Sequence, residues 1–164
     1  INLSGATIGD DTFLDYVREQ LNRFDLPHDS ICFEITETSA IANLERASRF
    51  IEELKDLGCS FSLDDFGSGM SSFGYLKHLP VDFIKIDGSF VKDMAEDPID
   101  RAMVEAINSV GHVMGKQTIA EFVDSDLVMK ALREIGVDFA QGYWLGKPQP
   151  FEPRLKIASS RSAS

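Results

Sequence analysis

Short apolar runs alternate with longer segments of helical periodicity along most of the chain. The short runs are rich in Phe, Ile and Val, and they are bounded by Gly, Pro, Asp or Ser, as β-strands commonly are. They predict five strands and one shorter stub at the N-terminus. The strands are expected at Ile31–Thr36, Ser60–Phe66, Asp82–Asp87, Gln117–Val123 and Phe139–Trp144, and the stub at Ile1–Ser4.

Between the runs, apolar residues recur with the spacing of amphipathic helices. Gly58, Gly115 and Gly136 follow three of these segments and are typical helix stop signals. Strands that alternate with helices of this length indicate parallel βαβ units. The helices are expected at Thr12–Phe24, Leu44–Leu57, Ile99–Met114 and Leu127–Ile135.

Parallel βαβ units form either an open doubly wound sheet or a closed (β/α) barrel. The first strand is not followed by a Gly-rich phosphate loop, which argues against a nucleotide-binding sheet. A complete eight-stranded barrel takes ~250 residues, whereas this chain has 164. The chain is therefore too short to close such a barrel in the usual way. Its last residues, rich in Ser and Arg, are expected to form a frayed tail over 151–164.

Each predicted strand carries a polar side chain on the face opposite its apolar residues, because side chains alternate across a strand. Most of these polar residues lie near the C-terminal end of their strand, where parallel α/β folds place their active sites. Both faces of a parallel sheet are normally covered, so a shared polar face indicates a site rather than solvated edges. The residues are Glu34, Asp64, Lys85, Asp87, Glu121 and Gln141.

Carboxylates dominate this polar set, which also includes Asp65 next to Asp64, and only Lys85 offsets their charge locally. Crowded carboxylates are costly unless a cation binds, and all-oxygen ligands favour Mg²⁺ or Mn²⁺ over zinc. The adjacent aspartates suggest two neighbouring ions, an arrangement that serves phosphodiester hydrolysis. The same residue types also permit enolase-type chemistry or glycoside hydrolysis.

Charge and composition narrow the choice of partner and compartment. With 16 Lys and Arg against 27 Asp and Glu, the net charge is −11, so a basic surface for a DNA or RNA polymer is not expected. No apolar run reaches the ~18 residues of a membrane span. The chain opens without a signal-peptide pattern, and its two cysteines form neither a disulfide framework nor a zinc site. We expect a cytoplasmic domain.

Six short stretches, taken together and in order, resemble the EAL-domain family of cyclic di-GMP phosphodiesterases. Any one of them alone would be a weak signal, but the combination is highly specific and runs from Asn2 to about Pro150. The stretches are Asn2–Ser4, Phe33–Glu37, Asp64–Gly69, Leu79–Asp87, Ala120–Val123 and Gln141–Tyr143.

The resemblance implies a TIM-like (β/α) barrel, incomplete at its N-terminus in this chain, with residues 1–150 forming a partial phosphodiesterase domain. It also implies that the parent domain opens cyclic di-GMP to linear pGpG with two divalent cations, Mg²⁺ or Mn²⁺. By position, the resemblance implies metal ligands at Asn2, Glu34, Asp64, Asp65 and Glu121. It further implies catalytic roles for Lys85, Glu121 and Gln141, loop stabilisation by Glu37, and substrate contacts at Asp87 and Tyr143.

The chain departs from the family pattern at three positions: Met70 replaces the usual Tyr, Phe122 the usual Gly and Asp124 the usual Glu. The Glu-Ala-Leu segment that names the family does not occur in the chain. It would lie before Ile1, so we expect the 164-residue chain to be impaired. Every acid of the expected metal cluster within the chain is present, so we expect the parent domain to be active. The alternative is a catalytically inactive cyclic di-GMP receptor or a dimerisation module.

The resemblance also implies partners and a context for the parent protein. Members of the family self-associate through helices that flank the Asp64–Ser72 loop, so a homodimer is expected. Regulatory sensor domains are expected elsewhere in the parent protein. A membrane anchor in the parent protein is compatible with this expectation.

Overall fold

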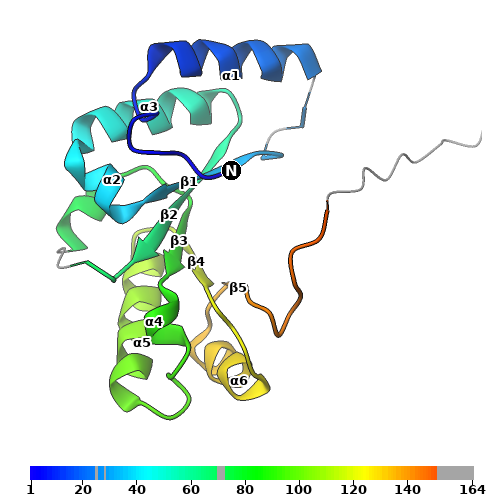
Figure 1. Cartoon of the computed structure of the whole chain (residues 1–164). Helices are drawn as coiled ribbons and strands as arrows, with labels where there is room; N and C mark the ends of the chain where they lie inside the picture. Colours follow the sequence, from blue (N-terminus) through cyan, green and yellow to red (C-terminus); the bar gives the residue numbers. More distant parts are fainter. Residues whose placement is uncertain (25, 28, 70–72, 151–164) are drawn as a thin grey trace, which may run out of the picture.

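The computed structural model describes residues 1–24, 26–27, 29–69 and 73–150. One sheet of five parallel strands runs through this part, in the order β1-β2-β3-β4-β5, so each strand pairs with its neighbour in the chain (Figure 1). Met70, one of the departures from the family pattern, and the tail expected at 151–164 lie outside the described residues. The strands are β1 (Cys32–Thr36), β2 (Ser60–Phe66), β3 (Phe83–Ile86), β4 (Gln117–Ala120) and β5 (Phe139–Ala140).

All five predicted strands are present, and the parallel α/β class is confirmed. Three strands end earlier than predicted: β3 ends one residue before Asp87, and β4 and β5 end at Ala120 and Ala140, where the chain leaves the sheet. As a result, Glu121 and Gln141 follow their strands rather than belonging to them. The predicted N-terminal stub is reduced to one parallel bridge between Asn2 and Glu34.

The four predicted helices are also present, each within a residue or so of its expected ends. Three short helical segments were not predicted, because one or two turns are too short to show a helical period. The long helices are α1 (Asp11–Phe24), α3 (Leu44–Asp56), α5 (Pro98–Val113) and α6 (Asp126–Ile135). The short segments are α2 (Glu37–Ala42), the 3₁₀ helix η1 (Phe73–His78) and α4 (Gly88–Val91).

Side chains that accept a hydrogen bond from the first helical turn fix where the long helices begin. Asn43 caps α3 by accepting from the amide of Arg46, and Ser125 caps α6 by accepting from the amide of Val128. Gly136 ends α6 in the left-handed conformation, at φ 83°. Among the described residues, no helix has both the length and the apolar content needed to cross a membrane.

Phenylalanine side chains join the first helices to the sheet. Figure 1 shows α1 and α3 side by side, and the rings of Phe13 in α1 and Phe50 in α3 stack with centroids 6.2 Å apart. Below them, Phe33 of β1 and Phe61 of β2 have centroids 5.6 Å apart. Full burial of each such side chain contributes roughly 1.5–3 kcal/mol, so this cluster is a main source of stability.

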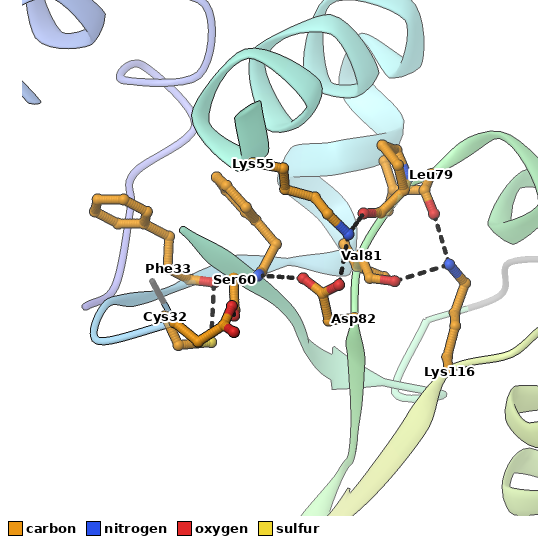
Figure 2. Close-up of polar contacts among 11 residues, drawn as sticks. Cys32, Phe33, Lys55, Ser60, Leu79, Val81, Asp82 and Lys116 are labelled. Carbon is orange, nitrogen blue, oxygen red and sulfur yellow. Dashed lines mark hydrogen bonds and ion pairs between the residues drawn. The ribbon is translucent and has the colours of Figure 1, made fainter. Parts of the chain in front are cut away.

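Asp82 ties the beginning of β3 to its neighbours (Figure 2). One carboxylate oxygen accepts a hydrogen bond from the amide of Phe61 at 2.9 Å, and the other accepts from the ammonium group of Lys55. Lys55 Nζ also donates to the carbonyl of Pro80 at 3.0 Å. The contacts join α3, β2 and β3 at the end of the sheet opposite the carboxyl ends of the strands.

Lys116, which directly precedes β4, makes a second polar contact at the same end. Its buried ammonium group donates to the carbonyls of Leu79 and Val81, at 2.8 and 2.9 Å (Figure 2). Burial, reinforced by the positive charge of Lys55, lowers the pKa of Lys116. The Leu79–Asp82 segment is therefore held on both sides by lysines.

We expect Asp82→Ala to lower the free energy of unfolding by about 1–3 kcal/mol, because the amide of Phe61 and the ammonium of Lys55 lose their common acceptor. Urea denaturation monitored by circular dichroism measures the change. Lys130→Ala is the control: it removes an exposed ion pair with Asp126 within α6, which contributes about 0.5 kcal/mol at most. Equal effects of the two substitutions would contradict the role given to Asp82.

Candidate functional site

The ammonium group of Lys85 lies at the centre of a cluster of carboxylates from neighbouring strands. It is 2.7 Å from Asp64 Oδ1, 2.8 Å from Glu121 Oε1 and 3.2 Å from Glu34 Oε2. Only 4% of the lysine side chain is exposed. The structure thus brings together four polar residues that the sequence placed on one face of four successive strands.

Burial and charge act in opposite directions on these groups. Burial lowers the pKa of Lys85, but hydrogen bonds and charges from Asp64 and Glu121 outweigh it, so the net shift is upward and the lysine stays protonated. Burial raises the pKa of Glu121, and Lys85 only partly offsets that rise. The cluster therefore favours cations over additional negative charge.

A β-bulge in β2 turns two consecutive aspartates toward the same site. Leu63 pairs with Ile84 and Phe66 pairs with Ile86, so β2 has one more residue than β3 over this stretch. Strict alternation would point Asp64 and Asp65 to opposite faces. The bulge, with Asp65 in the left-handed region at φ 55°, allows both carboxylates to approach Glu121.

Asp64, Asp65 and Glu121 form a group able to hold a metal ion. One carboxylate oxygen from each lies within 4.8 Å of those of the other two. Burial raises the pKa of Asp65, and the charges of Asp64 and Asp87 raise it further. Carboxylates that repel one another in a partly buried site are stabilised by a hard divalent cation, so the residues fit such an ion.

Glu37 contacts the segment that follows the bulge. Its carboxylate, almost fully buried at the start of α2, accepts hydrogen bonds from the Gly67 amide at 3.1 Å and the Tyr75 hydroxyl at 2.8 Å. Burial raises the pKa of Tyr75, and the adjacent Glu37 raises it further, so the phenol remains a donor. The contact of Tyr75 with Glu37 was not predicted from the sequence. A tyrosine shortly after the loop is the only sequence feature that indicates it.

Four other predicted site residues make no contact with Lys85 among the described interactions. Asn2 is joined to Glu34 through the backbone bridge, and Asp87 caps α4 by accepting from the amide of Ser89. Gln141 is exposed and follows β5. Tyr143 is 72% exposed, with the ammonium of Lys147 5.6 Å from its ring centroid. Their substrate and ligand roles therefore stay predictions.

Comparison with known families decides what kind of domain this is. The family model described as EAL domain matches residues 1–148. The chain belongs to the EAL domain family. Its five parallel strands, with the acidic cluster at their carboxyl ends, are thus part of the TIM-like barrel that was predicted.

Curated EAL proteins match almost the whole chain. Cyclic di-GMP phosphodiesterase PdeB of Shewanella oneidensis is 48% identical over 162 residues, which are 94% of this chain and 19% of that protein. Cyclic di-GMP phosphodiesterase PdeA of Borreliella burgdorferi is 37% identical over 92% of this chain and 22% of its own length. The chain thus spans about a fifth of the length of these relatives.

Solved EAL structures superpose on the fold. The EAL domain of Mycobacterium smegmatis DcpA matches with a TM-score of 0.84 and 36% identity, over 90% of this chain and 66% of that one. The EAL domain of FimX from Pseudomonas aeruginosa bound to c-di-GMP matches with a TM-score of 0.85 and 34% identity, over 90% and 61% of the two chains.

We expect Glu37→Ala to raise the hydrogen-exchange rate of the Gly67 amide in this EAL domain, because that amide loses its acceptor. Tyr75→Phe should have a smaller effect, since the carboxylate stays in contact with Gly67. Exchange monitored by NMR or mass spectrometry measures the change, with core amides of β3 as the internal control. An unchanged rate at Gly67 in Glu37→Ala would show that the contact does not hold this segment.

Proposed function

We propose that the protein containing this chain hydrolyses cyclic di-GMP to linear pGpG with two divalent cations, Mg²⁺ or Mn²⁺. The observation that carries the proposal is the buried Lys85 ammonium bonded to three carboxylates, next to an aspartate pair aimed at the same site. Relatives named cyclic di-GMP phosphodiesterases and EAL structures bound to c-di-GMP support the choice of substrate.

The proposed ion sites use the oxygen ligands at the carboxyl ends of the strands. Asp64, Asp65 and Glu121 would hold one ion, and this choice is supported by the approach of their carboxylate oxygens. Asn2 and Glu34 would hold the other together with Asp64, and the backbone bridge between the first two supports this. Bound ions of this kind supply charge stabilisation at a phosphoryl group and lower the pKa of a water.

The protein side chains would orient and position the reacting groups. Lys85 would hold Glu34, Asp64 and Glu121 in place through its three contacts. These contacts use all three of its N–H donors, so it would donate to the phosphate or the attacking water by giving up one of them. Glu37 would keep the loop after Asp65 in position through Gly67. Gln141 would act in catalysis with Lys85 and Glu121, and Asp87 and Tyr143 would contact the substrate.

The alternative function is an inactive cyclic di-GMP receptor or a dimerisation module. A homodimer is proposed for the parent protein, as the family resemblance implies. Sensor domains are proposed from the much greater length of the relatives.

We expect hydrolysis of cyclic di-GMP by the full-length protein to stop after removal of divalent cations and to return when Mg²⁺ or Mn²⁺ is added, because the converging ligands are all oxygens. Chromatographic measurement of pGpG is the assay. The 164-residue chain is assayed in parallel, and we expect it to be impaired. Undiminished turnover in excess chelator would rule out the two-metal proposal.

In the full-length protein, Asp64→Asn should nearly abolish turnover, because a carboxylate proposed to serve both ions loses its charge. Lys85→Ala should lower kcat more than it raises KM, since its contacts act on the reacting groups. Asp126→Asn in the exposed ion pair of α6 is the control and should leave both parameters unchanged. If Lys85→Ala changed KM alone, the role proposed for the lysine would be wrong.

A further inference from the structure

Ser62, in the middle of β2, has a buried hydroxyl group with no hydrogen-bond partner among the described residues. Only 1% of the residue is exposed. A hydroxyl that leaves water without gaining a new partner is unfavourable, and native proteins contain few of them. Alanine would fill nearly the same space without leaving a polar atom unpaired, so folding alone does not account for a serine here.

The sheet register places this hydroxyl group beside Glu34. Residues paired in register on neighbouring parallel strands have their side chains on the same face, with the strands about 4.8 Å apart. Ser62 pairs with Glu34 of β1 on one side and with Phe83 of β3 on the other. The phenylalanine side chain has no polar atom, so of the two register partners only Glu34 offers a side-chain acceptor.

Glu34 is the carboxylate that Lys85 holds least tightly. Its Oε2 is 3.2 Å from the ammonium nitrogen, against 2.7 Å for Asp64 Oδ1 and 2.8 Å for Glu121 Oε1. Its side chain is also the most exposed of the three, at 26%. All three N–H donors of the lysine are engaged, so a hydrogen bond to the phosphate or the attacking water requires the release of one contact. The longest contact, to Glu34, is the least costly to release.

We propose that Ser62 is a positioning residue: its hydroxyl donates to the Glu34 carboxylate when Lys85 turns to the phosphate or the attacking water. The inference rests on the function proposed above. Rotation of the serine about its Cα–Cβ bond reorients the hydroxyl among three staggered positions without moving the backbone. Glu34 thus keeps a donor after the lysine has released it, and carboxylates that ligate ions are oriented by such hydrogen bonds.

The first test compares variants of the full-length protein in the hydrolysis of cyclic di-GMP. Ser62→Ala should lower kcat roughly tenfold or more and leave KM within about twofold, as expected for loss of a group that orients a ligand. Ser62→Thr, which keeps the hydroxyl, should restore most of kcat. Ser60→Ala, on the same strand and the same face, is the control. The hydroxyl that it removes already has a partner, Asp29 Oδ1 at 3.0 Å, so kcat should not change.

Stability separates positioning from a purely structural role. Ser62→Ala should leave the urea midpoint of unfolding unchanged or raise it, because the hydroxyl that it removes has no partner. In a Lys85→Met background, without divalent cations or substrate, Ser62→Ala should lower the midpoint instead. There the lysine no longer holds Glu34, and the hydroxyl is bonded to the carboxylate.

A lower kcat in Ser62→Ala that Ser62→Thr restores, together with the reversed effect on the midpoint in Lys85→Met, supports the inference. Unchanged kcat in Ser62→Ala would overturn it, and so would the same change of midpoint with and without Lys85. If the wild type did not hydrolyse cyclic di-GMP, the proposed function would fail, and the unfolding comparison would still decide on Ser62. If Lys85→Met did not fold, the kinetic comparison would decide alone.

Discussion

The balance of charge around the Lys85 ammonium group is the constraint on which the site depends. Carboxylates from β1, from β2 and from the residue after β4 converge on this single nitrogen, which is itself almost completely buried. Each group would be costly to bury alone, and the lysine offsets part of the negative charge of the carboxylates. The lysine thereby fixes the spacing of the very side chains that would hold divalent ions.

Stability and chemistry are located at opposite ends of the sheet. At the beginning of the strands, Lys55, Asp82 and Lys116 hold the Leu79–Asp82 segment with hydrogen bonds to buried backbone groups. At the carboxyl ends, the acidic groups are held close to one another and are not fully paired. An α/β domain can tolerate such an unfavourable arrangement because the other end of the same strands is well satisfied.

The positions of the strands and of most of the acidic cluster could be predicted from the sequence, because alternation places Glu34, Asp64 and Lys85 on one face. Alternation could not predict that Asp65 joins Asp64, since that depends on a bulge whose extra residue leaves no mark in the hydrophobic pattern. Tyr75 was missed for a similar reason: its partner, Glu37, is distant in the chain. Tertiary contacts set both features.

The strand order also has a consequence for how the protein is made. Every strand pairs with the one synthesised just before it, and helices between strands pack on the sheet already formed. The sheet can therefore grow by one strand and helix at a time as the chain leaves the ribosome, from β1 toward β5. Glu34 is then synthesised before its partner Lys85, and the acidic cluster is complete only after Glu121 has been synthesised and has folded onto the sheet.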